Sequence, residues 1–130
     1  MSTIMAAAAV REAGAQSVVV SLGPDGLLAV TGDGCWHARP TAVVTGNATG
    51  AGDAVVAALA HGLVSGRQWP GRLHHAVALG AAAVASPVAG EFVSADYAAG
   101  LDTATVRELP ATSWPAPHQP RSTGQEQEAR

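Results

Sequence analysis

Short apolar blocks separated by glycine and polar residues run along the chain, and they predict helices and strands in alternation. The block from Ser2 to Ala13 contains a run of alanines, has Ser2 or Thr3 available as a cap and is followed by Gly14, so it predicts a helix. The short apolar run Val18 to Leu22 comes next and is typical of a strand buried on both faces of a parallel sheet.

The next part of the chain predicts a hairpin and then a strand, a loop and a helix. Strands are predicted over Leu27 to Thr31 and Cys35 to Arg39, since Gly32-Asp33-Gly34 between them contains an Asp-Gly hairpin signal. They indicate an antiparallel edge of the sheet. Another strand, Ala42 to Thr45, leads into a glycine-rich loop and the apolar helix Ala54 to Val64. The alternation predicts an α/β fold.

The C-terminal third predicts two more helices and a tail. Arg72 to Ser86 has apolar residues near one face and predicts a helix, and Asp102 to Leu109 predicts a last short helix with a cap at its start. From Pro110 onward the composition changes to Pro, Ser, Gln and Glu. We therefore expect one structured lobe over residues 1–109 and a disordered tail over residues 110–130.

Composition narrows the classes of function. The chain has 130 residues, of which 48% are hydrophobic and 13% charged, which is typical of one soluble domain. All seven basic residues are Arg, which excludes a phosphate-loop lysine and a Schiff-base lysine. The net charge of −3 and the lack of a basic run predict neither nucleic acid nor an anionic membrane as a partner.

Cysteine, histidine and targeting signals add little chemistry. Cys35 is the only cysteine, so an internal disulfide and a CxxC pair are excluded, and we expect a cytoplasmic protein without a signal peptide or membrane span. His74 and His75 are adjacent, so on a helix they point in different directions and cannot grip one metal ion. We expect no metal site built by the chain.

The most informative segment is the turn Gly50-Ala51-Gly52-Asp53 at the start of a predicted helix. Small residues let the backbone approach a ligand closely, and a helix N-terminus presents free amides and roughly half a positive charge. This setting suits the terminal phosphate of a nucleotide, with Asp53 beside it to take a proton from an acceptor hydroxyl. The alternative interpretation is that Asp53 only caps the helix and the glycines only form a tight turn.

A second glycine turn, Ser21-Leu22-Gly23-Pro24-Asp25-Gly26, follows directly after the predicted buried strand. Open α/β sheets bind ligands at the carboxyl ends of their strands, so the two turns can converge on one ligand. The alternative for this turn is a connection that needs glycine for backbone reasons alone.

Together these residues resemble the ribokinase-like carbohydrate kinases, the pfkB family. The segment Asn47-Ala48-Thr49-Gly50-Ala51-Gly52-Asp53-Ala54 is similar to the C-terminal signature of that family, although Ala48 departs from its usual residues. The resemblance implies that Asp53 is the catalytic base and that Gly50, Ala51 and Gly52 form the anion hole. It also implies nucleotide-binding positions at Ser21, Gly23, Asp25, Gly26, Asn47 and Leu79.

The resemblance also implies a fold and an activity. The fold is the C-terminal part of a three-layer αβα sandwich, with a mostly parallel sheet and a short antiparallel edge. The activity is ATP-dependent phosphoryl transfer, with Mg²⁺, to a sugar or sugar phosphate, and the branch is that of the 1-phosphofructokinases and tagatose-6-phosphate kinases. The similar region covers residues 5–109 and corresponds to only the C-terminal portion of a family chain.

Two further hypotheses remain beside that of a sugar kinase, which we expect to be truncated or split. A truncated or split kinase needs a companion chain or self-association to cover its exposed strand edges, and a non-catalytic remnant would bind the nucleotide without transferring phosphate. An unrelated α/β domain would use its glycine loops only as structural turns.

Overall fold

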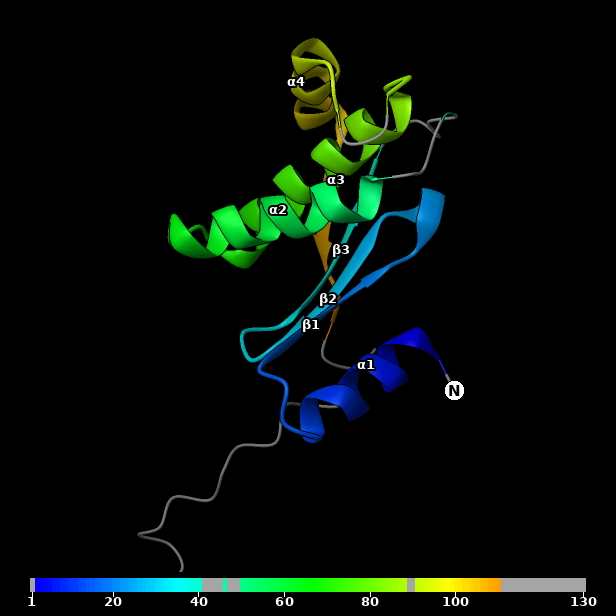
Figure 1. Cartoon of the computed structure of the whole chain (residues 1–130). Coiled ribbons are helices and arrows are strands. Elements are labelled where there is room, and N and C mark those ends of the chain that lie inside the picture. The colour runs from blue at the N-terminus through cyan, green and yellow to red at the C-terminus, as the bar shows by residue number, and fades with distance from the viewer. Residues whose placement is uncertain (1, 41–45, 47–49, 89–90, 111–130) are drawn as a thin grey trace, which may run out of the picture.

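Helices cover both faces of a four-stranded sheet in the computed structural model, which describes residues 2–40, 46, 50–88 and 91–110 (Figure 1). α1 (Thr3–Glu12) lies on one face, and α2 (Ala51–Val64) and α3 (Trp69–Ala85) lie on the other. α4 (Ser94–Thr103) packs against α3. The α/β class expected from the sequence is therefore confirmed, and the described elements form three layers.

The sheet contains β1 (Ser17–Ser21), β2 (Leu27–Thr31), β3 (Cys35–Arg39) and β4 (Thr105–Glu108) in that spatial order. Every pairing between them is antiparallel. The expectation of a mostly parallel sheet is therefore wrong for the described strands. The reason is that β1, β2 and β3 are joined by short turns, and such turns connect only antiparallel neighbours.

Most predicted elements appear close to their expected bounds. Ser2 caps α1 by accepting a hydrogen bond from the Met5 amide at 3.2 Å, and the predicted hairpin strands coincide with β2 and β3. α3 begins earlier than expected, at Trp69, because Pro70 is tolerated in a first helical turn, where its missing N–H costs no bond. The predicted strand Ala42 to Thr45 and the tail from residue 111 lie outside the described residues.

The predicted helix Asp102 to Leu109 is wrong. The helix there ends at Thr103, and the chain continues as β4, which pairs with β3. Val106 lies opposite Ala38 and packs against the core. The pairing also gives hydrogen-bond partners to backbone groups at the edge of β3. This tertiary contact, together with the β-branched Thr105 and Val106, outweighs the local cap signal at Asp102.

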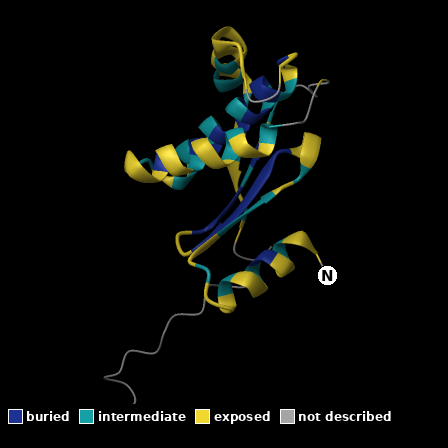
Figure 2. Cartoon of the chain, viewed as in Figure 1, coloured by how far each residue is buried: buried dark blue, intermediate teal, exposed yellow. Residues whose placement is uncertain are grey.

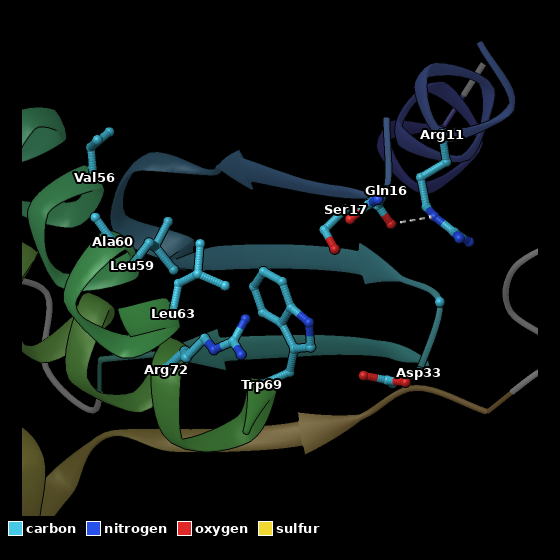
Figure 3. A pocket seen from close by; sticks show the side chains of 11 residues that line it. Arg11, Gln16, Ser17, Asp33, Val56, Leu59, Ala60, Leu63, Trp69 and Arg72 are labelled. Carbon is cyan, nitrogen blue, oxygen red and sulfur yellow. Dashed lines mark hydrogen bonds between the residues drawn. The ribbon is translucent and has the colours of Figure 1, made fainter. Parts of the chain in front are cut away.

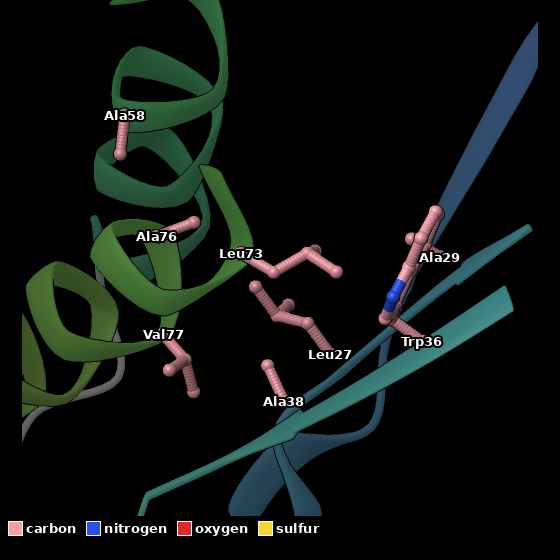
Figure 4. Packing of buried hydrophobic residues seen from close by; sticks show 8 residues of the cluster. All are labelled: Leu27, Ala29, Trp36, Ala38, Ala58, Leu73, Ala76 and Val77. Carbon is pink, nitrogen blue, oxygen red and sulfur yellow. The ribbon is translucent and has the colours of Figure 1, made fainter. Parts of the chain in front are cut away.

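Alternate residues of the hairpin strands build two cores, one on each face of the sheet. The larger core lies between α3 and the sheet (Figure 4), where Leu73 is fully buried, and it comprises Leu27, Ala29, Trp36, Ala38, Ala58, Leu73, Ala76 and Val77. The smaller core packs Leu28, Val30 and Cys35 against Ala7 of α1. Figure 2 shows that burial is concentrated in the hairpin strands and α3, whereas α1 and α2 keep wide exposed faces.

No helix in the described ranges is long and apolar enough to cross a lipid bilayer.

We predict that Gly26→Ala destabilises the fold. Gly26 has φ +93°, and a Cβ there would lie 1.9 Å from the carbonyl oxygen of Ala38. Because backbone must shift to admit the methyl group, we expect a loss of about 2 kcal/mol or more in the free energy of unfolding, measured by urea denaturation. Gly52→Ala is the control, since a Cβ there meets no atom of the described neighbours within 4 Å. Equal unfolding free energies for the two variants would contradict the prediction.

Candidate functional site

The first turn of α2 is the centre of the candidate site. Gly50 is the N-cap in the left-handed conformation, with φ 84° and ψ −8°. The first intrahelical bond runs from the Ala54 amide to the Gly50 carbonyl at 3.0 Å. The amides of Ala51, Gly52 and Asp53 precede this bond, and no backbone carbonyl of the described residues accepts from them. The first amides of a helix have no acceptor within the helix, so an acceptor from outside it could bind them.

This turn is open on its outer side. Among the described residues, a Cβ at Gly52 would meet no neighbouring atom within 4 Å, and both Gly52 and Asp53 are exposed. An anion at this helix end would gain from the free amides and from the helix dipole. The carboxylate of Asp53 would then lie next to the anion, where it could accept a proton from a hydroxyl group.

The second predicted turn forms the 3-10 helix η1 (Gly23–Asp25), which follows β1 and lies at the same end of the sheet as the start of α2 (Figure 1). Ser21 ends β1 and is exposed, as are Gly23 and Asp25. Gly26 is buried, and its close approach to Ala38 gives it a structural role that needs no ligand. At this one position the backbone conformation and packing explain the glycine without a ligand.

The remaining predicted nucleotide positions have different surroundings. Leu79 lies on α3, is half-buried and packs against the larger core. Asn47 lies outside the described residues. The structure therefore places the Gly50–Asp53 turn and η1 at one end of the molecule, and gives Leu79 a packing role.

Sequence reasoning missed two residues that hold η1. His37 Nε2 lies 2.8 Å from the Asp25 carbonyl oxygen, and Arg39 Nη2 lies 3.2 Å from Asp25 Oδ1. The signal was the alternation of His37 and Arg39 on one face of a predicted strand that borders the turn. Neither residue shares a local motif with Asp25, so the contacts of His37 and Arg39 with Asp25 could be found only from the structure.

Other titratable groups belong to the packing of the fold. Burial raises the pKa of the Cys35 thiol, so this cysteine is a poor nucleophile. The pKa of His75 is lowered, mainly by burial and further by the charges of Arg67, His74 and His61. The His75 ring contacts the Tyr97 hydroxyl and links α3 to α4.

Metal ligands do not gather in the part of the chain that the structure describes. No group of three or more His, Cys, Asp or Glu side chains there could hold a metal ion.

A separate groove of about 830 Å³ lies between α2 and the sheet edge at β1 (Figure 3). Its lining is largely apolar, with arginine side chains around it, and includes Arg11, Val56, Leu59, Leu63, Trp69 and Arg72. Val56 and Leu63 are each 65% exposed. Among the described strands β1 pairs only with β2, so the groove adjoins an edge of β1 that no described strand covers. None of the predicted site residues lines it.

Comparisons with known proteins identify relatives of the chain. A family model described as pfkB family carbohydrate kinase matches residues 2–96. A 1-phosphofructokinase of Escherichia coli (strain K12) is 40% identical over 87 residues, which make up 67% of this chain and 28% of that protein. The chain thus spans little more than a quarter of this relative.

Solved structures of phosphofructokinases are also similar to this chain. Phosphofructokinase-2 from Escherichia coli in complex with potassium matches with a TM-score of 0.69 and 31% identity, over 75% of this chain and 32% of that one. The tetrameric inhibited form of that enzyme matches with a TM-score of 0.64 and 31% identity, over 75% and 31% of the two chains.

The open space at Gly52 predicts that Gly52→Ala separates ligand binding from folding. We expect the free energy of unfolding without ligand to stay equal or rise by up to about 1 kcal/mol, because alanine favours a helix. If an anion such as the phosphate of MgATP binds at this turn, the rise in melting temperature on adding MgATP should be lost, because the methyl group would occupy the space of the phosphate. Thermal melts with and without MgATP measure both quantities, and an unchanged MgATP shift would contradict the prediction.

Proposed function

Because this chain belongs to the pfkB family of carbohydrate kinases, we propose that it carries the nucleotide-binding and catalytic part of an ATP-dependent phosphoryl transfer to a sugar or sugar phosphate. The observation that supports this proposal is the Gly50–Asp53 turn, which combines free helix amides, open space and an exposed carboxylate. The chain covers 28% of the 1-phosphofructokinase that it matches. The activity of that whole enzyme is therefore proposed for this chain.

In the proposed reaction the amides of Ala51, Gly52 and Asp53 hold the oxygens of the terminal phosphate. The acceptor hydroxyl oxygen attacks the γ-phosphorus, and the bond from that phosphorus to the β–γ bridging oxygen breaks. The hydroxyl proton passes to the carboxylate of Asp53. Because the transition state of phosphoryl transfer is loose, positioning and charge compensation by the helix N-terminus supply most of the catalysis.

The nucleotide would extend from this turn along the end of the sheet towards η1. Ser21, Gly23 and Asp25 are exposed there and would border it, and Gly26 would keep the turn in its conformation. We keep Asn47 and Leu79 as proposed nucleotide contacts, Asn47 from the family signature and Leu79 from its place on the alanine-rich helix α3.

We also propose that polypeptide packing on β1 and the adjoining groove completes the sugar-binding side. An exposed strand edge beside apolar side chains is a surface that a stable fold covers. The occupant is a companion chain or a second copy of this chain. One solved relative, phosphofructokinase-2 from Escherichia coli, is described in a tetrameric form, which supports self-association as a property of such kinases.

A non-catalytic nucleotide-binding subunit is the second candidate. It is favoured by the proposed site residues themselves: they are assigned to the nucleotide and to the base, and none is assigned to binding of the acceptor sugar. Binding of MgATP without a ternary complex with any sugar phosphate would distinguish it from the kinase.

Asp53→Asn tests the proposed base. The carboxamide keeps the size of the side chain but cannot take the hydroxyl proton, so we expect kcat to fall by about 10²–10⁴-fold with little change in KM for MgATP. A coupled ATP-turnover assay with fructose 1-phosphate, fructose 6-phosphate and tagatose 6-phosphate measures both values.

Asp96→Asn is the matched control, because Asp96 lies in the first turn of α4 as Asp53 does in α2. Each variant loses a carboxylate that favours a helix N-terminus by about 0.3–1 kcal/mol. If Asp53 is only a cap, both variants lower stability alike and neither lowers turnover. A wild-type chain with an MgATP melting shift but no turnover would favour the non-catalytic subunit, and one with neither would favour an unrelated domain.

Leu63→Lys tests the proposed groove. Leu63 is already 65% exposed, so we expect the melting temperature of the separate chain to stay unchanged while self-association decreases, because a charge would enter an apolar contact. Light scattering after size-exclusion chromatography measures the association. Val64→Lys is the control, since Val64 is 88% exposed and is not part of the groove lining. Equal association of both variants and the wild type would contradict self-association through this surface.

A further inference from the structure

Two side chains of β3 attach the turn η1 to the sheet. The carbonyl oxygen of Asp25 can only accept a hydrogen bond, so His37 Nε2, at 2.8 Å, carries the proton and donates it. Arg39 Nη2 donates to Asp25 Oδ1 at 3.2 Å. His37 and Arg39 lie two positions apart on β3 and therefore share one face of the strand, so both reach the same residue of the turn.

These contacts are not needed to close the turn. η1 is already closed by backbone bonds from Leu22 to Gly26 at 2.8 Å, from Asp25 to Leu22 at 3.2 Å and from Gly26 to Gly23 at 3.1 Å. The side chains of Arg39 and Asp25 are 56% and 67% exposed, and an ion pair at such exposure contributes little to stability. The two contacts therefore mainly fix where the turn lies relative to the sheet.

Charge gives the ion pair a second effect. Asp25 carries a carboxylate on a turn that, in the proposed function, borders the bound nucleotide, whose phosphate groups are negatively charged. A bare carboxylate there would repel the phosphates, and the repulsion would grow with their number. The guanidinium of Arg39 compensates this charge at the carboxylate itself.

We propose that His37 and Arg39 are positioning residues for the nucleotide: His37 fixes the backbone of η1, and Arg39 neutralises Asp25 so that the turn tolerates a polyphosphate. This inference rests on the proposed function, because it assumes that η1 borders the bound nucleotide. Neither residue needs to touch the nucleotide or the acceptor. Their effect passes through Asp25.

The test compares the affinities of the purified chain for MgATP and for adenosine, measured by isothermal titration calorimetry. In Arg39→Ala we expect the Kd for MgATP to rise by about tenfold, which is a typical size for coupling between neighbouring groups. The Kd for adenosine should rise by less than about twofold. Asp25→Asn combined with Arg39→Ala should restore most of the MgATP affinity, because the repelling carboxylate is then absent. His37→Ala should weaken both ligands, and His37→Gln, which keeps an N–H donor, should recover part of the loss.

Arg107→Ala is the matched control. Arg107 lies opposite His37 on β4, is exposed, and makes no hydrogen bond or ion pair through its side chain with another described residue. It removes the same charge from the neighbouring strand without touching η1. Melting temperatures without ligand show that each variant folds, and we expect them to lie close to that of the wild type.

The outcomes separate this inference from the proposed function. If the wild type binds MgATP and Arg39→Ala binds it equally well, or weakens adenosine as much as MgATP, the role of Arg39 is overturned while the nucleotide site stands. The role of Arg39 is also overturned if Arg107→Ala and Arg39→Ala raise the Kd for MgATP equally. The same holds if adding Asp25→Asn to Arg39→Ala fails to restore the MgATP affinity. A wild type that binds no MgATP overturns the proposed function and this inference with it.

Discussion

The packing of α3 on the sheet is the contact on which the rest of the described structure depends. Leu73 of α3 is fully buried against the sheet, and Ala76 and Val77 follow it into the same core. α2, which carries Asp53, packs mainly on α3 and hardly on the strands. The position of the candidate base relative to η1 is therefore set indirectly, through the interface between α3 and the hairpin strands.

Two glycines let α2 lie this close to α3. A Cβ at Gly80 of α3 would lie 2.9 Å from Val55 Cγ2, and a Cβ at Gly62 of α2 would lie 2.6 Å from Arg72 Cγ. Both distances are below normal contact, so a side chain at either position would force the neighbouring side chain of the other helix to shift. The alanine-rich composition has the same effect along the interface: each residue buries little area, but the backbones approach closely. A thin, closely packed core can in this way hold the end of α2 in place.

The sequence predicted those structural features that depend on residues close together in the chain. The cap at Ser2, the Asp33-Gly34 hairpin and the Gly50–Asp53 turn at a helix start all have local causes, and the structure contains each of them. The direction of the sheet and the strand β4 were missed because they depend on pairing between distant segments. The same applies to the contacts of Asp25 with His37 and Arg39, which lie 12 and 14 positions further along the chain.

The glycines of the two turns differ in what the fold requires of them, and this difference supports a ligand at one of them. At Gly26 a side chain would strike the Ala38 carbonyl, so packing alone explains the residue. At Gly52 the described neighbours leave open space and the conformation is helical, so alanine would fit and would favour the helix. A residue that the local structure does not need and the helix disfavours is best explained by something that approaches it from outside. The nucleotide phosphate proposed to bind next to Asp53 would be such a partner.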